Sequence, residues 1–231
     1  MSELYLIRHG QASFGSENYD QLSPLGYNQS LLLGSYFLER NIGFDHSFTG
    51  SMRRHNQTLE GIGEGLGEGL LESAQTHTGF NEYDFAKLMK SFSNLHPDDE
   101  LVRYVAENPL DKKNFYRLMK QALLAWANNA LDDVPETWNA FQQRIAEART
   151  MLHELAVTGS RVLVVSSGGA ISQFIGSVLN LSPEMVFELN LQMRNTGICH
   201  FYCNAHKISL SGFNSVPHLD QSNRVALSTY G

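Results

Sequence analysis

Leu4-Tyr5-Leu6-Ile7-Arg8-His9-Gly10 is the stretch of sequence that decides the fold. Its four apolar residues predict a short buried strand, and the polar stretch from Ser13 to Ser23 predicts a loop that follows the strand. The basic tripeptide Arg8-His9-Gly10 therefore stands at the carboxyl end of a strand. Ser23 as N-cap and Pro24 at the first helical position predict a helix directly after the loop.

The same order of strand, loop and helix recurs further along the chain. Residues 44–49 form a second short apolar stretch, and the pattern after Gly50-Ser51 predicts a helix that opens near Arg53-Arg54. Residues 161–167 form the strongest predicted strand, whose apolar run rich in β-branched residues is typical of a parallel strand covered on both faces. Gly168-Gly169 turns this strand into a helix that extends to Leu179.

Strands that alternate with helices predict an α/β fold, here a three-layer α/β/α sandwich with a mostly parallel sheet. Ligands of such sheets bind beyond the carboxyl ends of the strands. His9, Arg54 and Ser167 follow three separate predicted strands. We therefore expect their side chains to meet at one edge of the sheet.

The alternation is interrupted in the middle of the chain. Over residues 86–135 apolar residues recur at helical spacing, as in Phe115, Leu118, Met119, Leu123 and Trp126. We interpret this region as a helical insertion in a single domain that spans residues 1–231. A further helix is predicted over residues 136–158, and a last strand over residues 198–202.

Composition narrows the classes of function. The chain has 231 residues, 42% of them hydrophobic, and a formal net charge of −7, which indicates a soluble globular protein and argues against a general binder of nucleic acid or membrane surfaces. No apolar run approaches the roughly 18 residues of a membrane span. The first residues lack the features of an export signal, so we expect a cytoplasmic protein. Cys199 and Cys203 give neither a disulfide framework nor a zinc-ligand pattern.

The residue types at the predicted strand ends suit phosphoryl transfer to an imidazole. That chemistry needs a neutral ring nitrogen, fixed positive donors for the phosphoryl oxygens, and an acid that protonates the leaving group. His9 supplies the nitrogen, and the guanidinium groups of Arg8 and Arg54 bind phosphate oxygens in pairs. Glu82 is the candidate acid if burial raises its pKa. This chemistry requires no metal and no cofactor.

Several segments in this order resemble the histidine phosphatase superfamily, the phosphoglycerate mutase-like fold. The matching segments are Arg8-His9-Gly10, the run from Asp20 to Gln29, Arg54-x-x-Gln57-Thr58, Glu82-x-x-Phe85, Val164 to Gly169, and Asn195-Thr196. The resemblance implies that His9 is the nucleophile, Glu82 the proton donor, and Arg8, Arg54 and Asn195 phosphate contacts. It covers residues 3–200 apart from the insertion, and it implies a phosphomonoester hydrolase.

The sequence departs from the family pattern at several places near these motifs, including Ala12, where family members often have serine or threonine, and Ala86, where glycine is common. Ser167 occupies the position of a second histidine that contacts the phosphoryl group, and Gly50-Ser51-Met52 replaces the usual Ser-Pro-Leu. A serine hydroxyl donates a hydrogen bond to phosphate but brings no charge. We therefore expect Ser167 to bind phosphate more weakly than histidine does, and we expect Ser167→His to raise the rate.

Alternatives remain for the roles of individual residues and for the function. Arg53 competes with Arg54, Asp84 with Glu82, and His200 is a further candidate from the last strand. The substrate is a phosphorylated small molecule or phosphoprotein, with pocket walls from residues 13–18, the insertion and residues 193–196. A catalytically impaired relative that binds a phosphorylated ligand is one alternative. A phosphomutase is another, although the insertion has no basic segment for a second phosphate.

Overall fold

In the computed structural model, which describes residues 1–13, 20–155, 159–222 and 224–230, the strands form one six-stranded sheet. The strand order is β3-β2-β4-β1-β5-β6. The four strands β1 (Ser2–Arg8), β2 (His46–Thr49), β3 (Gln75–Thr76) and β4 (Arg161–Ser166) pair in parallel, whereas β5 (Ile198–Cys203) and β6 (Ile208–Ser215) are antiparallel. The predicted α/β sandwich with a mostly parallel sheet is confirmed.

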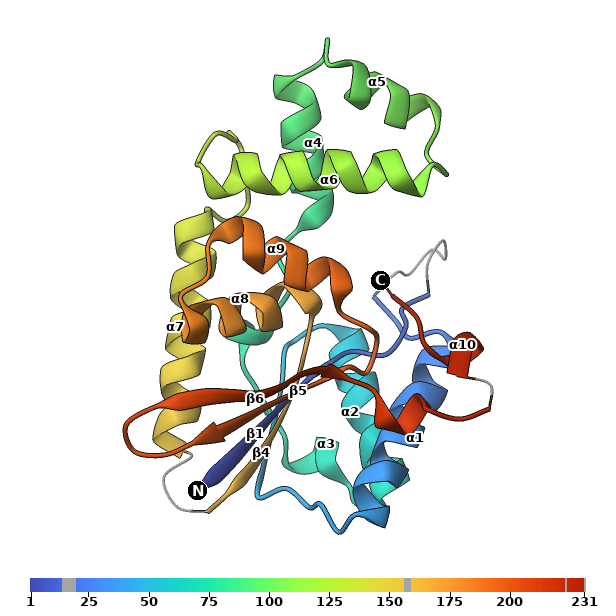
Figure 1. Ribbon diagram of the computed structural model, residues 1–231, viewed down its shortest axis with the longest axis vertical. Helices are drawn as coiled ribbons and strands as arrows, with labels where there is room; N and C mark the ends of the chain where they lie inside the picture. The colour runs from blue at the N-terminus through green and yellow to red at the C-terminus, as the bar shows by residue number, and fades with distance from the viewer. Residues whose placement is uncertain (14–19, 156–158, 223, 231) are drawn as a thin grey trace.

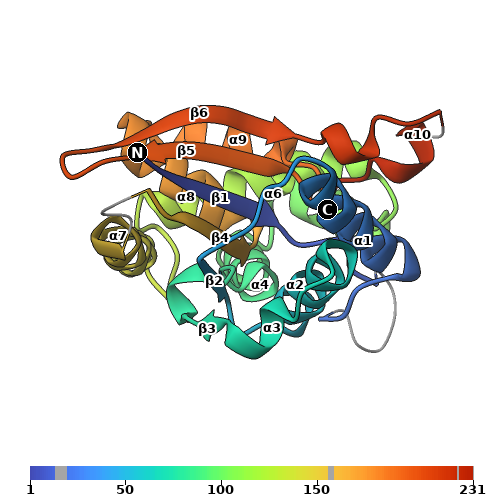
Figure 2. The ribbon, with the colours of Figure 1, turned by 90° about the horizontal axis from the view of Figure 1, so that it is seen from below.

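Helices cover both faces of the sheet. Figure 2 shows α1 (Pro24–Glu39) and α2 (Arg53–Leu66) on one side of it, and α7 (Trp138–Leu155) and α8 (Gly168–Leu179) on the other. Successive side chains of a strand point to opposite faces of the sheet, so alternate residues of the buried strands pack against the two helical layers. Tyr5 and Ile7 pack in the cluster with α1 and α2, whereas Leu4 and Leu6 pack in the cluster with α7 and α8.

Local signals in the sequence place several of these helices. The Ser23 hydroxyl accepts a hydrogen bond from the Gly26 N–H, and Pro24 begins α1, as predicted. The structure ends α2 at Leu66 because Gly67 adopts a left-handed conformation with φ of 79°. The glycine-rich segment from Gly63 to Leu70 is thus a helix end that leads into the short helix α3 (Leu70–Ser73).

The predicted insertion is helical. It contains α4 (Phe85–Leu95), α5 (Glu100–Glu107) and α6 (Lys112–Ala127), and Figure 1 shows these three helices stacked at one end of the molecule. Trp126 of α6 packs against Tyr83 and against Phe141 and Trp138 of α7, with ring centroids 5.0–5.3 Å from its own. This aromatic cluster joins the insertion to the layer that covers the sheet.

The last part of the chain departs from the sequence analysis. A single last strand was expected, but β5 is followed by the edge strand β6, and α9 (Pro183–Gln192) lies between α8 and β5. The short elements η1 (Thr78–Phe80), η2 (Pro217–Leu219) and α10 (Arg224–Leu227) were not predicted either. The residues after β6 return to α1, where the Gln29 side-chain amide donates hydrogen bonds to Leu227 O and Thr229 Oγ1.

Replacing Phe141 by alanine should reduce the free energy of unfolding by about 3–5 kcal/mol, because its fully buried ring joins the insertion to the core. Urea denaturation monitored by circular dichroism would measure the loss. Leu110→Ala is the control within the insertion, since Leu110 is 92% exposed and should change the free energy by less than about 0.5 kcal/mol. Equal losses for the two variants would contradict this account of the core.

Candidate active site

The site begins with the pairing of two parallel strands. Arg8 of β1 pairs with Ser166 of β4, so the residues that follow, His9 and Ser167, stand side by side at the carboxyl ends. Odd-numbered residues of both strands, such as Ile7 and Val165, face the α1 and α2 layer. By the same alternation His9 and Ser167 face the N-terminal turn of α2, which carries Arg54.

Hydrogen bonds fix the tautomer of His9. Its Nδ1 lies 2.7 Å from Gly10 O, and its Nε2 lies 3.2 Å from Nε of Arg54. A carbonyl oxygen only accepts and a guanidinium only donates, so we assign the proton to Nδ1 and the lone pair to Nε2. Burial lowers the pKa of His9 well below its ordinary value of 6.5, and the charges of Arg54 and Arg8 lower it further. The ring is therefore neutral, and the Nε2 lone pair faces the arginine.

Arg54 is held in place by an acidic side chain from the loop before α1. The two residues at the start of α2 point in different directions, with Arg53 exposed and Arg54 only 7% exposed. Asp20 accepts from Nη1 of Arg54 at 2.7 Å, and its other oxygen accepts from the Arg53 N–H at 2.9 Å. Asp20 thus caps α2 and orients the guanidinium. The geometry brings Arg54, and not Arg53, to His9.

Glu82 lies between η1 and α4, and its carboxyl group contacts the first turn of α8. Its carboxyl oxygens accept hydrogen bonds from the Gly169 N–H at 2.9 Å and the Tyr83 N–H at 3.2 Å. Burial raises the pKa of Glu82 above its ordinary value of 4.5, although the Gly169 hydrogen bond and the charge of Arg54 oppose this rise. A Cβ atom on Gly169 would lie 2.2 Å from Oε1 of Glu82, so this close approach requires glycine. The carboxyl group is thereby prepared to carry a proton.

The competitors of Glu82 and His9 lie elsewhere. Asp84 is exposed, accepts from the Lys87 N–H at 3.1 Å as the N-cap of α4, and forms an ion pair with the Lys87 ammonium. His200 pairs with Tyr5 in the sheet, and its Nε2 contacts Glu3 at 2.9 Å, six residues before His9. Residues 14–18 of the expected pocket wall lie outside the described residues.

Arg8 and Asn195 both have protein partners. Arg8 donates to the carbonyl of Met193, and its charge lowers the pKa of both His9 and Glu82. Asn195 is buried; its side-chain N–H donates to His9 O at 3.1 Å, and its side-chain oxygen accepts from Thr229 Oγ1 at 2.9 Å. Asn195 thus fixes the backbone of His9, a different contact from the phosphate contact that the resemblance implies.

The structure adds a residue that the sequence analysis left aside. His55, next to Arg54 on α2, is fully buried, and its Nε2 lies 2.7 Å from Oγ of Ser167. Its ring centroid is 5.8 Å from that of His9. One feature of the sequence could have pointed to His55, namely its position directly after Arg54 in the first turn of α2. Both residues of such a turn can face the edge of the sheet that the helix covers.

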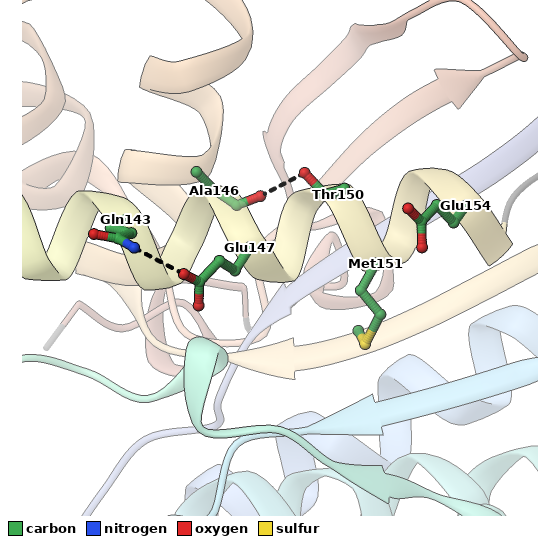
Figure 3. Close-up of a pocket in the computed structure, with 6 residues that line it drawn as sticks. All are labelled: Gln143, Ala146, Glu147, Thr150, Met151 and Glu154. Atoms are coloured by element: carbon green, nitrogen blue, oxygen red, sulfur yellow. Dashed lines mark hydrogen bonds between the residues drawn. The ribbon is translucent and has the colours of Figure 1, made fainter.

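Two surface hollows differ in how near their lining residues are to His9. One of about 470 Å³ is lined by Gln11, two residues after His9, by Lys112 and Tyr116 of α6, and by Leu191, Thr229 and Tyr230. The other, of about 450 Å³, lies along α7 and contains none of the residues around His9. Figure 3 shows two hydrogen bonds within the helix, with Gln143 donating to Glu147 and Thr150 donating to Ala146 O. The first hollow is therefore the one beside the site.

Metal-binding clusters and membrane-spanning helices are both absent from the part of the chain that the structure describes. It contains no group of three or more His, Cys, Asp or Glu side chains that would hold a metal ion. Within the same residues, no helix combines the length and the apolar composition that a membrane crossing requires.

The sheet order and the residues at its strand ends define the class of protein, an α/β protein with the phosphoglycerate mutase-like fold. The chain belongs to the histidine phosphatase superfamily (branch 1), whose family model matches residues 4–216. Membership of this superfamily indicates phosphatase activity.

Individual relatives are distant in sequence. A Hydrogenobacter thermophilus protein named “Putative phosphoserine phosphatase 2” is 22% identical over 96% of this chain and 99% of its own length. A phosphoserine phosphatase variant from Entamoeba histolytica, solved with phosphoserine, has a TM-score of 0.64 and 20% identity, covering 95% of this chain and all of that one. Phosphoglycerate mutase from Bacillus anthracis has a TM-score of 0.64 and 15% identity, covering 94% of each chain. These structural similarities establish the fold.

The tautomer of His9 can be measured directly by ¹⁵N NMR. We expect signals of a neutral ring with the proton on Nδ1, unchanged as the pH falls from 8 through 6.5, because the folded pKa lies well below that value. The unfolded chain binds a proton near pH 6.5, so the His9 contribution to stability decreases as the pH falls below that point. Loss of the signals in His9→Asn would assign them. A titration midpoint near 6.5 would contradict the assigned state.

Proposed function

We propose that the protein hydrolyses phosphomonoesters through a phosphohistidine intermediate on His9. The observation that supports this proposal most is the fixed tautomer, in which Gly10 O holds the proton on Nδ1 and an unprotonated Nε2 faces Arg54. An imidazole nitrogen attacks phosphorus only through a lone pair, and a neutral ring keeps that lone pair available at neutral pH. The superfamily of the chain supports the same class of reaction.

The reaction has two steps. In the first, Nε2 of His9 forms a bond to phosphorus, the ester P–O bond breaks, and the leaving oxygen takes the proton of Glu82. In the second, water attacks the phosphohistidine, the Glu82 carboxylate accepts a proton of that water, and the P–N bond breaks to release phosphate and restore His9. Arg8 and Arg54 stabilise the charge on the phosphoryl oxygens in both steps. Arg54 exchanges its contact with Nε2 for phosphoryl oxygens when substrate binds.

The substrate is a phosphorylated small molecule in this proposal. The hollow of about 470 Å³ is lined by Gln11, two residues after His9, and Lys112 and Tyr116 bring the insertion to its wall. Phosphoserine phosphatase from Entamoeba histolytica has been solved with phosphoserine and with 3-phosphoglyceric acid, which supports substrates of this size. A hydrolase is favoured over a phosphomutase because membership of the superfamily indicates phosphatase activity.

Acid-labile, base-stable labelling of His9 is the first prediction from this mechanism. Reaction with a ³²P-labelled aryl phosphate and rapid quenching should trap a phosphoramidate, which survives base and hydrolyses in acid. Mass spectrometry of the base-quenched protein should place the label on His9, and His9→Ala should abolish both label and turnover. A label on Ser167 or on a carboxylate would overturn the mechanism.

The same assay separates the enzyme from the phosphate-binding alternative. Ser167 supports that alternative, because a neutral hydroxyl stabilises the transition state less than a charged imidazole does. Tight binding of phosphate by calorimetry, without turnover of an aryl phosphate in the absence of added metal, would show a binding protein. Turnover that depends on His9 would show the hydrolase.

Replacing Glu82 by glutamine should slow alkyl phosphates by about 100-fold or more and aryl phosphates far less, because only the poor leaving group needs a proton as its bond breaks. For the unmodified protein the alkyl phosphate rate should fall as the pH rises through the raised pKa of Glu82, since the acid form is then lost. Glu82→Gln should lack that fall. Asp84→Asn is the neighbouring control, and an equal loss for both classes of substrate would make Glu82 a structural residue.

A further inference from the structure

Two of the places where the sequence departs from its family lie against one side chain, that of His55. The resemblance places a histidine at position 167 and a serine at position 50, where this chain has Ser167 and Gly50. Ser167 Oγ lies 2.7 Å from Nε2 of His55, and a Cβ atom on Gly50 would lie 2.3 Å from Nδ1 of the same ring. The missing bulk at both positions therefore leaves the space that the imidazole of His55 fills.

The hydroxyl of Ser167 is used for this contact and not for its usual local role. Ser167 is the N-cap residue of α8, where a serine side chain normally accepts a hydrogen bond from the first turn of the helix. No such cap bond is formed here, and among the described residues His55 is the hydrogen-bond partner of the hydroxyl. An ordinary helix cap thus does not account for Ser167.

The buried ring of His55 also has a preferred tautomer. Its Nδ1 is buried and has no hydrogen-bond partner in the described part of the chain, since it lies against Gly50. An orphaned N–H is rarer in protein interiors than an orphaned acceptor, so we assign the ring proton to Nε2. Nε2–H then donates to Ser167 Oγ, and the Ser167 O–H remains available for another acceptor.

We propose that His55 acts through Ser167 in place of the histidine that the family has at position 167. Ser167 stands beside His9 at the strand ends, so its O–H donates to an oxygen of the phosphoryl group that is bound there. The hydrogen bond from His55 orients this hydroxyl and polarises it, which strengthens its donation. Ser167 is thus a phosphate contact and His55 a positioning residue. The proposal rests on the proposed function.

This arrangement reverses one expectation from the sequence. Ser167→His was expected to raise the rate, but Ser167 is fully buried and the ring of His55 already lies against its hydroxyl. A second imidazole therefore has no space unless the first is removed. We now expect Ser167→His alone to lose activity, and the exchange His55→Ser with Ser167→His to be at least about 10-fold more active than Ser167→His alone.

Two substitutions of similar size test the hydrogen bond of His55. His55→Met removes the donor and should lower kcat/KM for an aryl phosphate by about 10- to 100-fold. The side-chain amide in His55→Gln can still donate a hydrogen bond, so this variant should keep part of the kcat/KM that His55→Met loses. Ser167→Ala should give a loss similar to that of His55→Met, and the double variant His55→Met with Ser167→Ala should fall no further. The inhibition constant of orthovanadate should rise least in His55→Gln and more in His55→Met and Ser167→Ala.

His153→Met is the matched control. His153 is also a helical histidine whose Nε2 contacts one oxygen, Asn204 O at 2.7 Å, but it lies at the far end of α7. It should leave kcat/KM and the orthovanadate constant unchanged. Equal losses in His55→Met and His55→Gln, or additive losses of His55→Met and Ser167→Ala, would show a purely structural histidine and overturn the proposal.

Binding separates failure of this proposal from failure of the proposed function. If the unmodified protein binds inorganic phosphate but does not turn over any phosphate ester, the hydrolase is wrong. Calorimetry with phosphate then still tests the hydrogen bond between His55 and Ser167. His55→Met and Ser167→Ala should bind phosphate more weakly, and His153→Met should bind it as the unmodified protein does. Unchanged phosphate binding in all three variants would overturn the role of His55, whether or not the protein is a hydrolase.

Discussion

The fixed parallel register between β1 and β4 is the constraint on which the rest of the site depends. Because Arg8 pairs with Ser166, His9 and Ser167 end their strands at the same level and on the same face. A shift by one residue would turn the imidazole toward the α7 layer and away from Arg54. The buried odd-numbered residues of both strands resist such a shift, since it would move their apolar side chains to the wrong layer.

Charge within the site is balanced locally, against the acidic character of the whole chain. The net charge of −7 would repel a phosphorylated molecule, yet two arginines beside His9 give the strand ends a positive potential. Asp20 holds one of these arginines without cancelling the other, and it does so from the solvent side, with its side chain 43% exposed. His9 is neutral beside these arginines, so its burial adds no further cation to the charge of the buried Arg54.

Most of the fold could be predicted from the sequence because its signals are local. Ser23-Pro24 caps α1, β-branched residues mark β4, and helical spacing marks the insertion. The sequence predicted His9 and Arg54 as site residues because they lie at a strand end and in the first turn of a helix. Glu82 was predicted from the resemblance to the family, since it neither directly follows a strand nor begins a helix. His55 and the orienting role of Asp20 were missed, since their function depends on partners 112 and 34 residues away in sequence. No periodicity records such contacts, and the edge strand β6 has too irregular a burial pattern to be recognised.

The link between Asn195 and Thr229 has a consequence for how the protein is made. Asn195 holds the carbonyl of His9, and the side chain and backbone of Thr229 in turn hold Asn195. A chain that emerges from the ribosome therefore carries every residue of the proposed chemistry before it carries Thr229, which holds Asn195 against His9. Until the segment around Thr229 has been synthesised and has docked beside α1, the nascent protein has its nucleophile but lacks one of the links that support it.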